Sequence, residues 1–141
     1  MVDRKTAEIL IEKALEARKN AYAPYSHFQV GAALLTDEGH IYTGCNIENA
    51  AFGPGNCAER TAFFKAVSEG EKFFTAIAVL GALQGQKIER YTTPCGVCRQ
   101  VMAEFCNPQG FEIIMAKSVN DYYSKTLFEL FPDSFGPSSL R

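Results

Sequence analysis

The sequence has no long apolar run, no cluster of basic residues and no leader-like segment at its beginning. A membrane span needs roughly 20 consecutive apolar residues. No stretch approaches that length, so we expect no membrane association. The formal net charge is -2, and lysines and arginines form no continuous stripe, which argues against a nucleic-acid partner and favours a small substrate. Residues 1–5 lead directly into an amphipathic pattern and not into a signal peptide, so we expect cytoplasmic localisation.

Cysteine is sparse and odd in number. Three of the five cysteines belong to motifs suited to a metal, so a disulfide scaffold is not expected and a reducing compartment fits. Cys45 and Cys106 lie outside those motifs, and we expect them to be small apolar residues of the core. With no repeat, linker or low-complexity segment, the 141 residues predict one domain over 1–141 with a real hydrophobic core.

Helical and strand patterns alternate along the sequence. Apolar residues at helical spacing predict helices, and short aliphatic runs bounded by turn residues predict strands. The expected helices cover 4–19, 57–69, 96–106 and a short segment near 125–130, and the expected strands cover 30–35, 41–45, 73–83 and 111–116. This alternation indicates an α/β fold, a layered sandwich around a mixed sheet of about five strands.

Two short motifs bring together thiols and a carboxylate. Cys57 is followed two positions later by Glu59, and Cys95 and Cys98 form a Pro-Cys-x-x-Cys segment. Zinc takes four tetrahedral partners, and catalytic sites leave one position for water. Three cysteines beside a glutamate that is not needed as a ligand therefore favour a hydrolytic Zn²⁺ centre. Each motif lies at an expected helix start, where the helix dipole stabilises thiolates.

A structural four-cysteine zinc clip and a redox Cys-x-x-Cys pair are the alternatives. Cys106 follows Cys98 along the same expected helix, about 12 Å away at roughly 1.5 Å per residue, which is too far to share the ion. Cys45 is the other candidate for a fourth thiol, but it lies in a different expected strand. A redox pair would leave Cys57 and Glu59 without a role, so the catalytic metal is favoured.

Arg60 follows the glutamate directly. Three thiolates and one Zn²⁺ carry a formal charge of about -1, which weakens the ion as a Lewis acid. We expect Arg60 to offset this charge by bonding a cysteine sulfur from the surroundings of the metal. The alternative is an ordinary surface arginine.

The sequence resembles the small cytidine deaminases in three segments, which are Asn46–Ala51, Cys57–Ala62 and Pro94–Gln100. The resemblance extends over nearly the whole chain, from Tyr25 to Phe135. Zinc deaminases combine a zinc held by cysteines with a glutamate that is not a ligand. The resemblance implies a three-layer α-β-α sandwich. It also implies deamination of cytidine and deoxycytidine to uridine and deoxyuridine in pyrimidine salvage, and a homotetramer with active sites shared between subunits.

The same resemblance implies a role for individual residues. The zinc ligands are Cys57, Cys95 and Cys98, and Glu59 transfers protons. Residues that contact the nucleoside are expected along the chain: Phe28 against the pyrimidine, Asn46 and Glu48 on the ribose, the backbone of Ala58 on the base edge, and Phe135 from a neighbouring subunit.

The sequence departs from the family pattern in two places. Phe52 stands where relatives often have tyrosine, so a hydroxyl contact is missing there. Asp133 and Ser134 replace a commoner Gly-Ala pair before Phe135, which puts the geometry of the tail in doubt. The histidines His27 and His40 are expected to be surface or turn residues.

Two other functions fit part of the pattern. Deaminases of nucleoside-like antibiotics such as blasticidin S share Cys-Ala-Glu and Pro-Cys-x-x-Cys, but Asn46 and Glu48 favour cytidine. A zinc-stabilised binding module without turnover is the non-enzymatic alternative. Open metal coordination together with ammonia release would exclude it.

Overall fold

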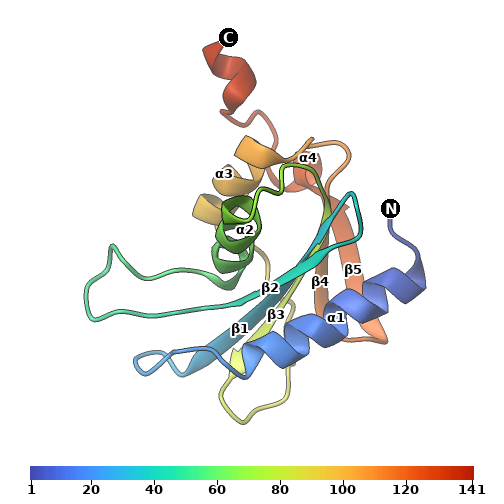
Figure 1. The fold of residues 1–141 in the computed structure, drawn as a ribbon. Coiled ribbons are helices and arrows are strands. Elements are labelled where there is room, and N and C mark those ends of the chain that lie inside the picture. Colours follow the sequence, from blue (N-terminus) through green and yellow to red (C-terminus); the bar gives the residue numbers. More distant parts are fainter.

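A five-stranded mixed sheet forms the centre of the protein. The computed structural model describes residues 1–141. The strands run in the order β2-β1-β3-β4-β5 across the sheet, and β3 and β4 are parallel while the other neighbours are antiparallel (Figure 1). Their bounds are β1 Phe28–Thr36, β2 Ile41–Cys45, β3 Phe74–Leu83, β4 Glu112–Ser118 and β5 Asp121–Thr126. The expected mixed α/β sheet is confirmed.

Helices cover both faces of this sheet (Figure 1). One face carries α1 (Arg4–Arg18), and the other carries α2 (Ala58–Ser68), α3 (Gly96–Phe105) and the short α4 (Leu127–Leu130). The three-layer α-β-α sandwich is therefore confirmed. None of the helices has the length and apolar character that crossing a bilayer requires.

Each face of the sheet has its own apolar cluster because alternate residues of a strand point to opposite sides. Leu10 and Ile11 of α1 pack over the small side chains of Ala33 and Ala78. On the opposite face, larger side chains fill the space below α2 and α3, among them Phe63, Met102, Phe111 and Met115. The sheet thus holds α2 and α3 side by side on one face.

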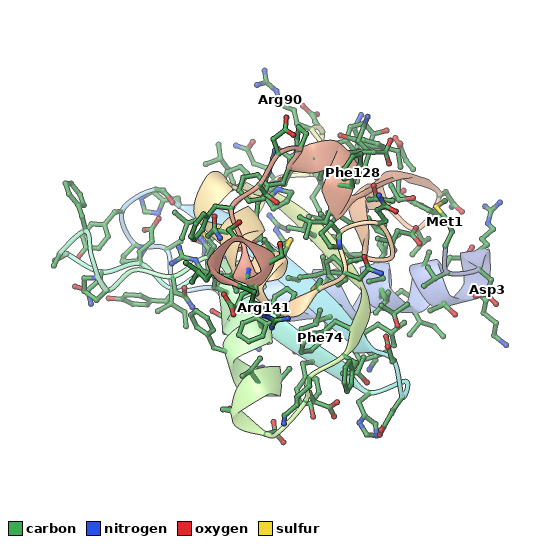
Figure 2. The ribbon with its side chains drawn as sticks, turned by 90° about the horizontal axis from the view of Figure 1, so that it is seen from above. Met1, Asp3, Phe74, Arg90, Phe128 and Arg141 are labelled. Carbon is green, nitrogen blue, oxygen red and sulfur yellow. The ribbon has the colours of Figure 1, made fainter.

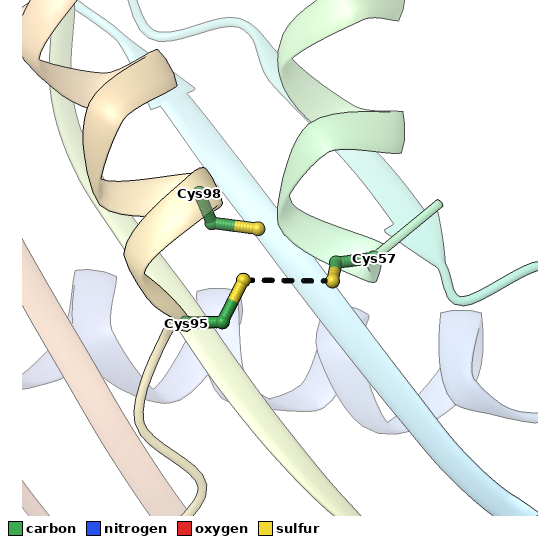
Figure 3. A group of neighbouring side chains, drawn as sticks. All are labelled: Cys57, Cys95 and Cys98. Carbon is green, nitrogen blue, oxygen red and sulfur yellow. Dashed lines mark hydrogen bonds between the residues drawn. The ribbon is translucent and has the colours of Figure 1, made fainter. Parts of the chain in front are cut away.

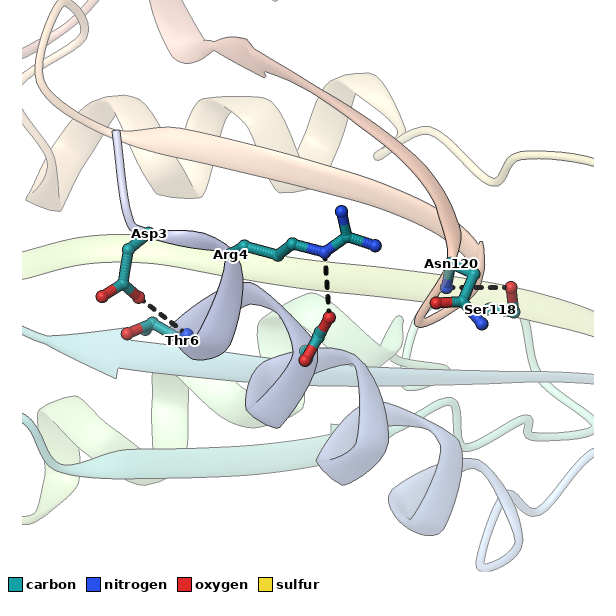
Figure 4. Close-up of polar contacts among 6 residues, drawn as sticks. Asp3, Arg4, Thr6, Ser118 and Asn120 are labelled. Carbon is teal, nitrogen blue, oxygen red and sulfur yellow. Dashed lines mark hydrogen bonds and ion pairs between the residues drawn. The ribbon is translucent and has the colours of Figure 1, made fainter.

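Side-chain hydrogen bonds define the start of α1 and the turn between β4 and β5 (Figure 4). Asp3 precedes α1, and its carboxylate accepts a hydrogen bond of 2.8 Å from the backbone N–H of Thr6. This N-cap satisfies one of the free N–H groups of the first turn. In the turn, the Asn120 N–H donates to the Ser118 hydroxyl at 3.2 Å.

The position of the fifth strand is not predicted by the sequence, and the helix expected near 125–130 is present and begins at Leu127. β5 is an edge strand of mostly polar residues in which exposed and partly buried positions alternate, so it has no apolar run. α4 starts after Thr126, which forms a reciprocal capping box with Glu129. This pair of hydrogen bonds ends the strand and begins the helix.

Two segments lie apart from the sandwich. The loop over 46–56 projects on the side opposite to Met1 and Asp3, as the two views show (Figures 1 and 2). At its tip Phe52 is fully exposed. The C-terminal tail, with the 3-10 helix η1 (Pro137–Leu140), extends beyond α3 and carries the exposed Phe135 (Figure 1).

Candidate metal centre and substrate cavity

The cysteines of the two motifs meet at the starts of α2 and α3 (Figure 3). Cys57 is the N-cap of α2, Cys95 is the N-cap of α3, and Cys98 lies in the first turn of α3. Their three sulfurs lie within 4.8 Å of one another, and those of Cys57 and Cys95 are 3.8 Å apart. A tetrahedral zinc with Zn–S bonds of about 2.3 Å separates its sulfurs by about 3.8 Å. The donor set therefore fits one zinc ion.

The remaining cysteines do not belong to this cluster. Cys106, at the end of α3, is buried in the core as expected, and burial raises the pKa of its thiol. Cys45 ends β2 and is half-buried, so it lies at the border of the core and not inside it. Three protein sulfurs, without a fourth cysteine beside them, leave one tetrahedral position for another ligand.

The sulfur of Cys57 receives hydrogen bonds that stabilise its thiolate. A bond from Cys98 and a bond from Arg60 lower the pKa of Cys57 to about 5, although burial opposes this shift. The Cys98 thiol donates this hydrogen bond to Cys57, which raises the pKa of Cys98. The Arg60 Nη2 lies 3.4 Å from the Cys57 sulfur, so Arg60 bonds a cysteine sulfur as expected. The Arg60 Nε is buried without a hydrogen-bond partner.

Glu59 is a buried carboxylic acid in the first turn of α2. It is 4% exposed, and burial raises the pKa of its side chain to about 7, with a further contribution from the nearby Cys57 thiolate. Its own backbone N–H and Arg60 act in the opposite direction. A group that titrates near neutrality can both accept and donate a proton at working pH.

A cavity of about 600 Å³ opens beside the cluster. Its walls come from the start of α2, the loop over 46–56 and the residues before α3. The residues singled out in the sequence that line it are Asn46, Glu48, Phe52, Cys57, Ala58, Glu59, Arg60 and Cys95. Thr92 and Thr93 line it as well. Its volume lies within the range of pockets for small organic ligands.

Asn46 uses its side-chain amide to extend the sheet. Its Oδ1 accepts from the Val30 N–H at 2.9 Å, and its Nδ2 donates to the Phe28 carbonyl at 2.8 Å. The amide thus occupies the position of a strand residue opposite the start of β1. β1 begins at Phe28, two residues earlier than expected, because its backbone pairing with β3 extends to Phe28 and Leu83.

Glu48 is held by the segment before β1. Its carboxylate accepts from the backbone N–H groups of Tyr25 and Ser26 and from the Ser26 hydroxyl, at 3.0, 3.2 and 2.5 Å. The Ser26 hydroxyl bond is the main reason that the pKa of Glu48 is lowered. Ser26 has no predicted role in the site, although a serine two residues before a strand is a common turn signal.

Phe28 and Phe135 lie outside this cavity. Phe28 is 36% exposed at the first position of β1, and Phe135 is 58% exposed in the tail. The tail is attached to α3 by a hydrogen bond of 2.8 Å from the Gln100 amide to the Phe135 carbonyl. The substrate contacts expected of both aromatics stay predictions.

Comparisons with known proteins agree with this site. The family model described as cytidine and deoxycytidylate deaminase zinc-binding region matches residues 4–111. Proteins named cytidine deaminase from Sporosarcina psychrophila and Halalkalibacterium halodurans are each 48% identical, over 94% and 95% of this chain and 93% and 97% of their own lengths.

Solved structures are similar as well. That of cytidine deaminase from Burkholderia pseudomallei has 46% identity and a TM-score of 0.80, covering 90% of this chain and 97% of its own. That of cytidine deaminase from Mycobacterium tuberculosis has 35% identity and a TM-score of 0.77, covering 96% and 99%.

Proposed function

Because the chain belongs to the cytidine and deoxycytidylate deaminase family, we propose that it hydrolyses the C4–N bond of cytidine and deoxycytidine. The products are uridine or deoxyuridine and ammonia, in cytoplasmic pyrimidine salvage. The observation that carries this proposal is the meeting of three cysteine sulfurs, spaced for one zinc, with the buried Glu59 at one cavity. The chain acts as a single domain over 1–141.

Cys57, Cys95 and Cys98 are the proposed zinc ligands. When bound, zinc supplies a Lewis acid that brings the pKa of a coordinated water down toward roughly 7. Arg60 and the N-termini of α2 and α3 offset the negative charge of the thiolates. The short Arg60 contact to the Cys57 sulfur supports this role.

Glu59 moves the protons of the reaction. It takes one proton from the attacking water and gives it to N3 of the cytosine ring, which makes C4 electrophilic. It then takes the remaining proton of the added hydroxyl and passes it to the amino group, which leaves as ammonia. A pKa of about 7 suits one carboxylate to act as base and then as acid.

Asn46 and Glu48 bind the ribose hydroxyls, and the Ala58 backbone binds the base edge. The hydrogen bonds that hold both side chains leave little freedom to lose on binding, which favours affinity. Phe28 packs on the pyrimidine.

Phe135 reaches the site of a neighbouring subunit in a homotetramer. Its exposure outside its own cavity, and the exposure of Phe52 at the tip of the loop, support shared sites.

Ammonia release from cytidine by the purified protein tests the function. We expect turnover that a chelator abolishes and that added zinc restores, with deoxycytidine also consumed. Blasticidin S serves as the matched comparison substrate. Release from blasticidin S without release from cytidine would reject the proposal, as would no release from either by protein that holds one zinc per chain.

A further inference from the structure

Gly44 of β2 lies against the backbone of the helix that carries Cys57 and Glu59. It is buried, and a Cβ built on it would lie 2.4 Å from the Ala58 carbonyl oxygen and 2.6 Å from the Ala62 nitrogen. Both atoms belong to the first turns of α2 and are backbone, so no rotamer change relieves the clash. Glycine is therefore what lets α2 begin in direct contact with β2.

Thr61 fastens the same turn to the same strand. Its hydroxyl donates to the Cys45 carbonyl at 3.0 Å, with the Cys57 carbonyl at 3.2 Å as a second acceptor. It also accepts from the Asn56 amide at 3.1 Å. The residue before Cys57 and the residue after Gly44 are thus joined through one side chain.

The partner cysteines are held by other contacts. Cys95 and Cys98 belong to the start of α3, which packs against α4 and which Arg99 joins to the Leu130 carbonyl at the end of α4. A displacement of α2 away from β2 therefore changes the separation of Cys57 from the cysteines of α3. Real Cβ atoms essentially never approach within 3.0 Å, so an alanine at position 44 would move the first turn of α2 by about half an ångström or more, against a tolerance of about 0.2 Å in metal-ligand distances.

We propose that Gly44, with Thr61, is a positioning element that sets the distance between Cys57 and the cysteines of α3, and thereby the fit of the metal. The inference rests on the proposed zinc ligands. It concerns the affinity for metal, however, and not the identity of the nucleoside.

Gly31 provides a matched control on the opposite face of the sheet. A Cβ there would lie 2.0 Å from the Ala14 carbonyl oxygen and 2.8 Å from the Arg18 nitrogen, both in α1. Gly31 pairs with Cys45 in the register that pairs Ala32 with Gly44. Gly31→Ala therefore produces an equal or greater backbone clash in the same hairpin, but against a helix without site residues.

The experiment measures zinc affinity by competition with a chromogenic chelator, and the cobalt spectrum of each variant. We expect Gly44→Ala to weaken zinc binding by about tenfold or more, the range typical of residues that orient ligands, and to change the thiolate-to-cobalt charge-transfer bands. Gly31→Ala should lower the melting temperature at least as much, yet keep the affinity and spectrum of the wild type.

Thr61→Val decides the matter if Gly44→Ala does not fold, since it keeps the volume and removes the hydroxyl. We expect a loss of zinc affinity that is smaller than in Gly44→Ala, at the lower end of the range for residues that orient ligands, about tenfold. Wild-type affinity and spectrum in Gly44→Ala, or in Thr61→Val when Gly44→Ala is insoluble, would overturn the inference. An equal loss of affinity in Gly31→Ala would do so too. Wild-type protein that binds zinc but leaves cytidine unchanged would fail the proposed function alone.

Discussion

The two helices of the site, α2 and α3, begin differently from α1 and α4. At the start of α1 the carboxylate of Asp3 caps the Thr6 N–H, and at the start of α4 the Thr126 hydroxyl caps Glu129. At the starts of α2 and α3 the N-cap residues are cysteines, and neither makes a side-chain cap hydrogen bond. A good N-cap stabilises a protein by roughly 0.5–2 kcal/mol. α2 and α3 lack this stabilisation from an N-cap hydrogen bond. The positive ends of their dipoles instead face the cysteine thiolates.

Two glutamates, Glu59 and Glu112, are both buried but have different surroundings. Glu59 is buried below α2 beside a thiolate, which adds to the effect of burial in raising its pKa. Glu112 is similarly buried on the α1 side, where its carboxylate accepts from the Val2 N–H at 2.8 Å. The carboxylate of Glu59 lies beside the proposed metal ligands, whereas that of Glu112 holds the N-terminal segment by its hydrogen bond to Val2. Burial alone therefore does not identify a functional acid in this protein.

The largest effect is expected from the cluster itself. Cys98→Ala removes one of three proposed ligands, so zinc should fall from one per chain to near none and ammonia release should be lost. Cys106→Ala is the control on the same helix. It should keep zinc and cost about 1 kcal/mol of unfolding free energy as a core truncation. Metal analysis by mass spectrometry measures both, and full zinc occupancy in Cys98→Ala contradicts the ligand assignment.

The next largest effect separates the two glutamates. Glu59→Gln should keep zinc and fold but lower turnover by about 10²–10⁴-fold, because the amide cannot transfer protons. Glu112→Gln should turn over cytidine at the wild-type rate, since its amide oxygen can still accept from Val2. Steady-state kinetics on both variants tests this, and near-normal turnover by Glu59→Gln would reject the proton-transfer role.

A smaller effect is expected at the capped end of α1. Asp3→Ala removes the acceptor for the Thr6 N–H and should lower the unfolding free energy by about 1 kcal/mol. Zinc affinity should not change, because α1 lies on the opposite face from the cluster. Urea unfolding followed by zinc titration measures both quantities, and a parallel loss of zinc affinity would show that the two faces are coupled.

The smallest effect concerns the far end of α2. The His40 Nδ1 lies 2.8 Å from the Glu71 carboxylate beyond that end, and this hydrogen bond raises the pKa of His40. Because the folded pKa is raised, the pair stabilises fully below the unfolded value and its contribution disappears as pH rises through the folded value. The stability difference between wild type and His40→Asn should therefore shrink as pH rises above the ordinary histidine pKa of about 6.5. Thermal unfolding across that range checks the trend, and a difference that grows with pH would contradict it.

Local patterns predicted much of the site and of the fold. Cys57, Cys95 and Cys98 could be grouped because metal ligands at helix starts need short, fixed spacings. β3 was recognised by its apolar run because the centre of a sheet is buried on both sides. The polar edge strand β5 carries no such pattern, and its place depends on pairing with β4.

By itself the sequence determined which side chains are available: three thiols, an adjacent acid and an arginine, at positions where helices begin. It determined the layers too, because apolar periodicity reflects burial directly. The tertiary structure alone decided how closely Cys57 approaches Cys95 and that Ser26 holds the Glu48 carboxylate. It also decided that position 44 must be glycine, because a side chain there would meet the backbone of α2. These are contacts between segments distant in the chain, and their distances follow from how α2 and α3 pack on a shared sheet.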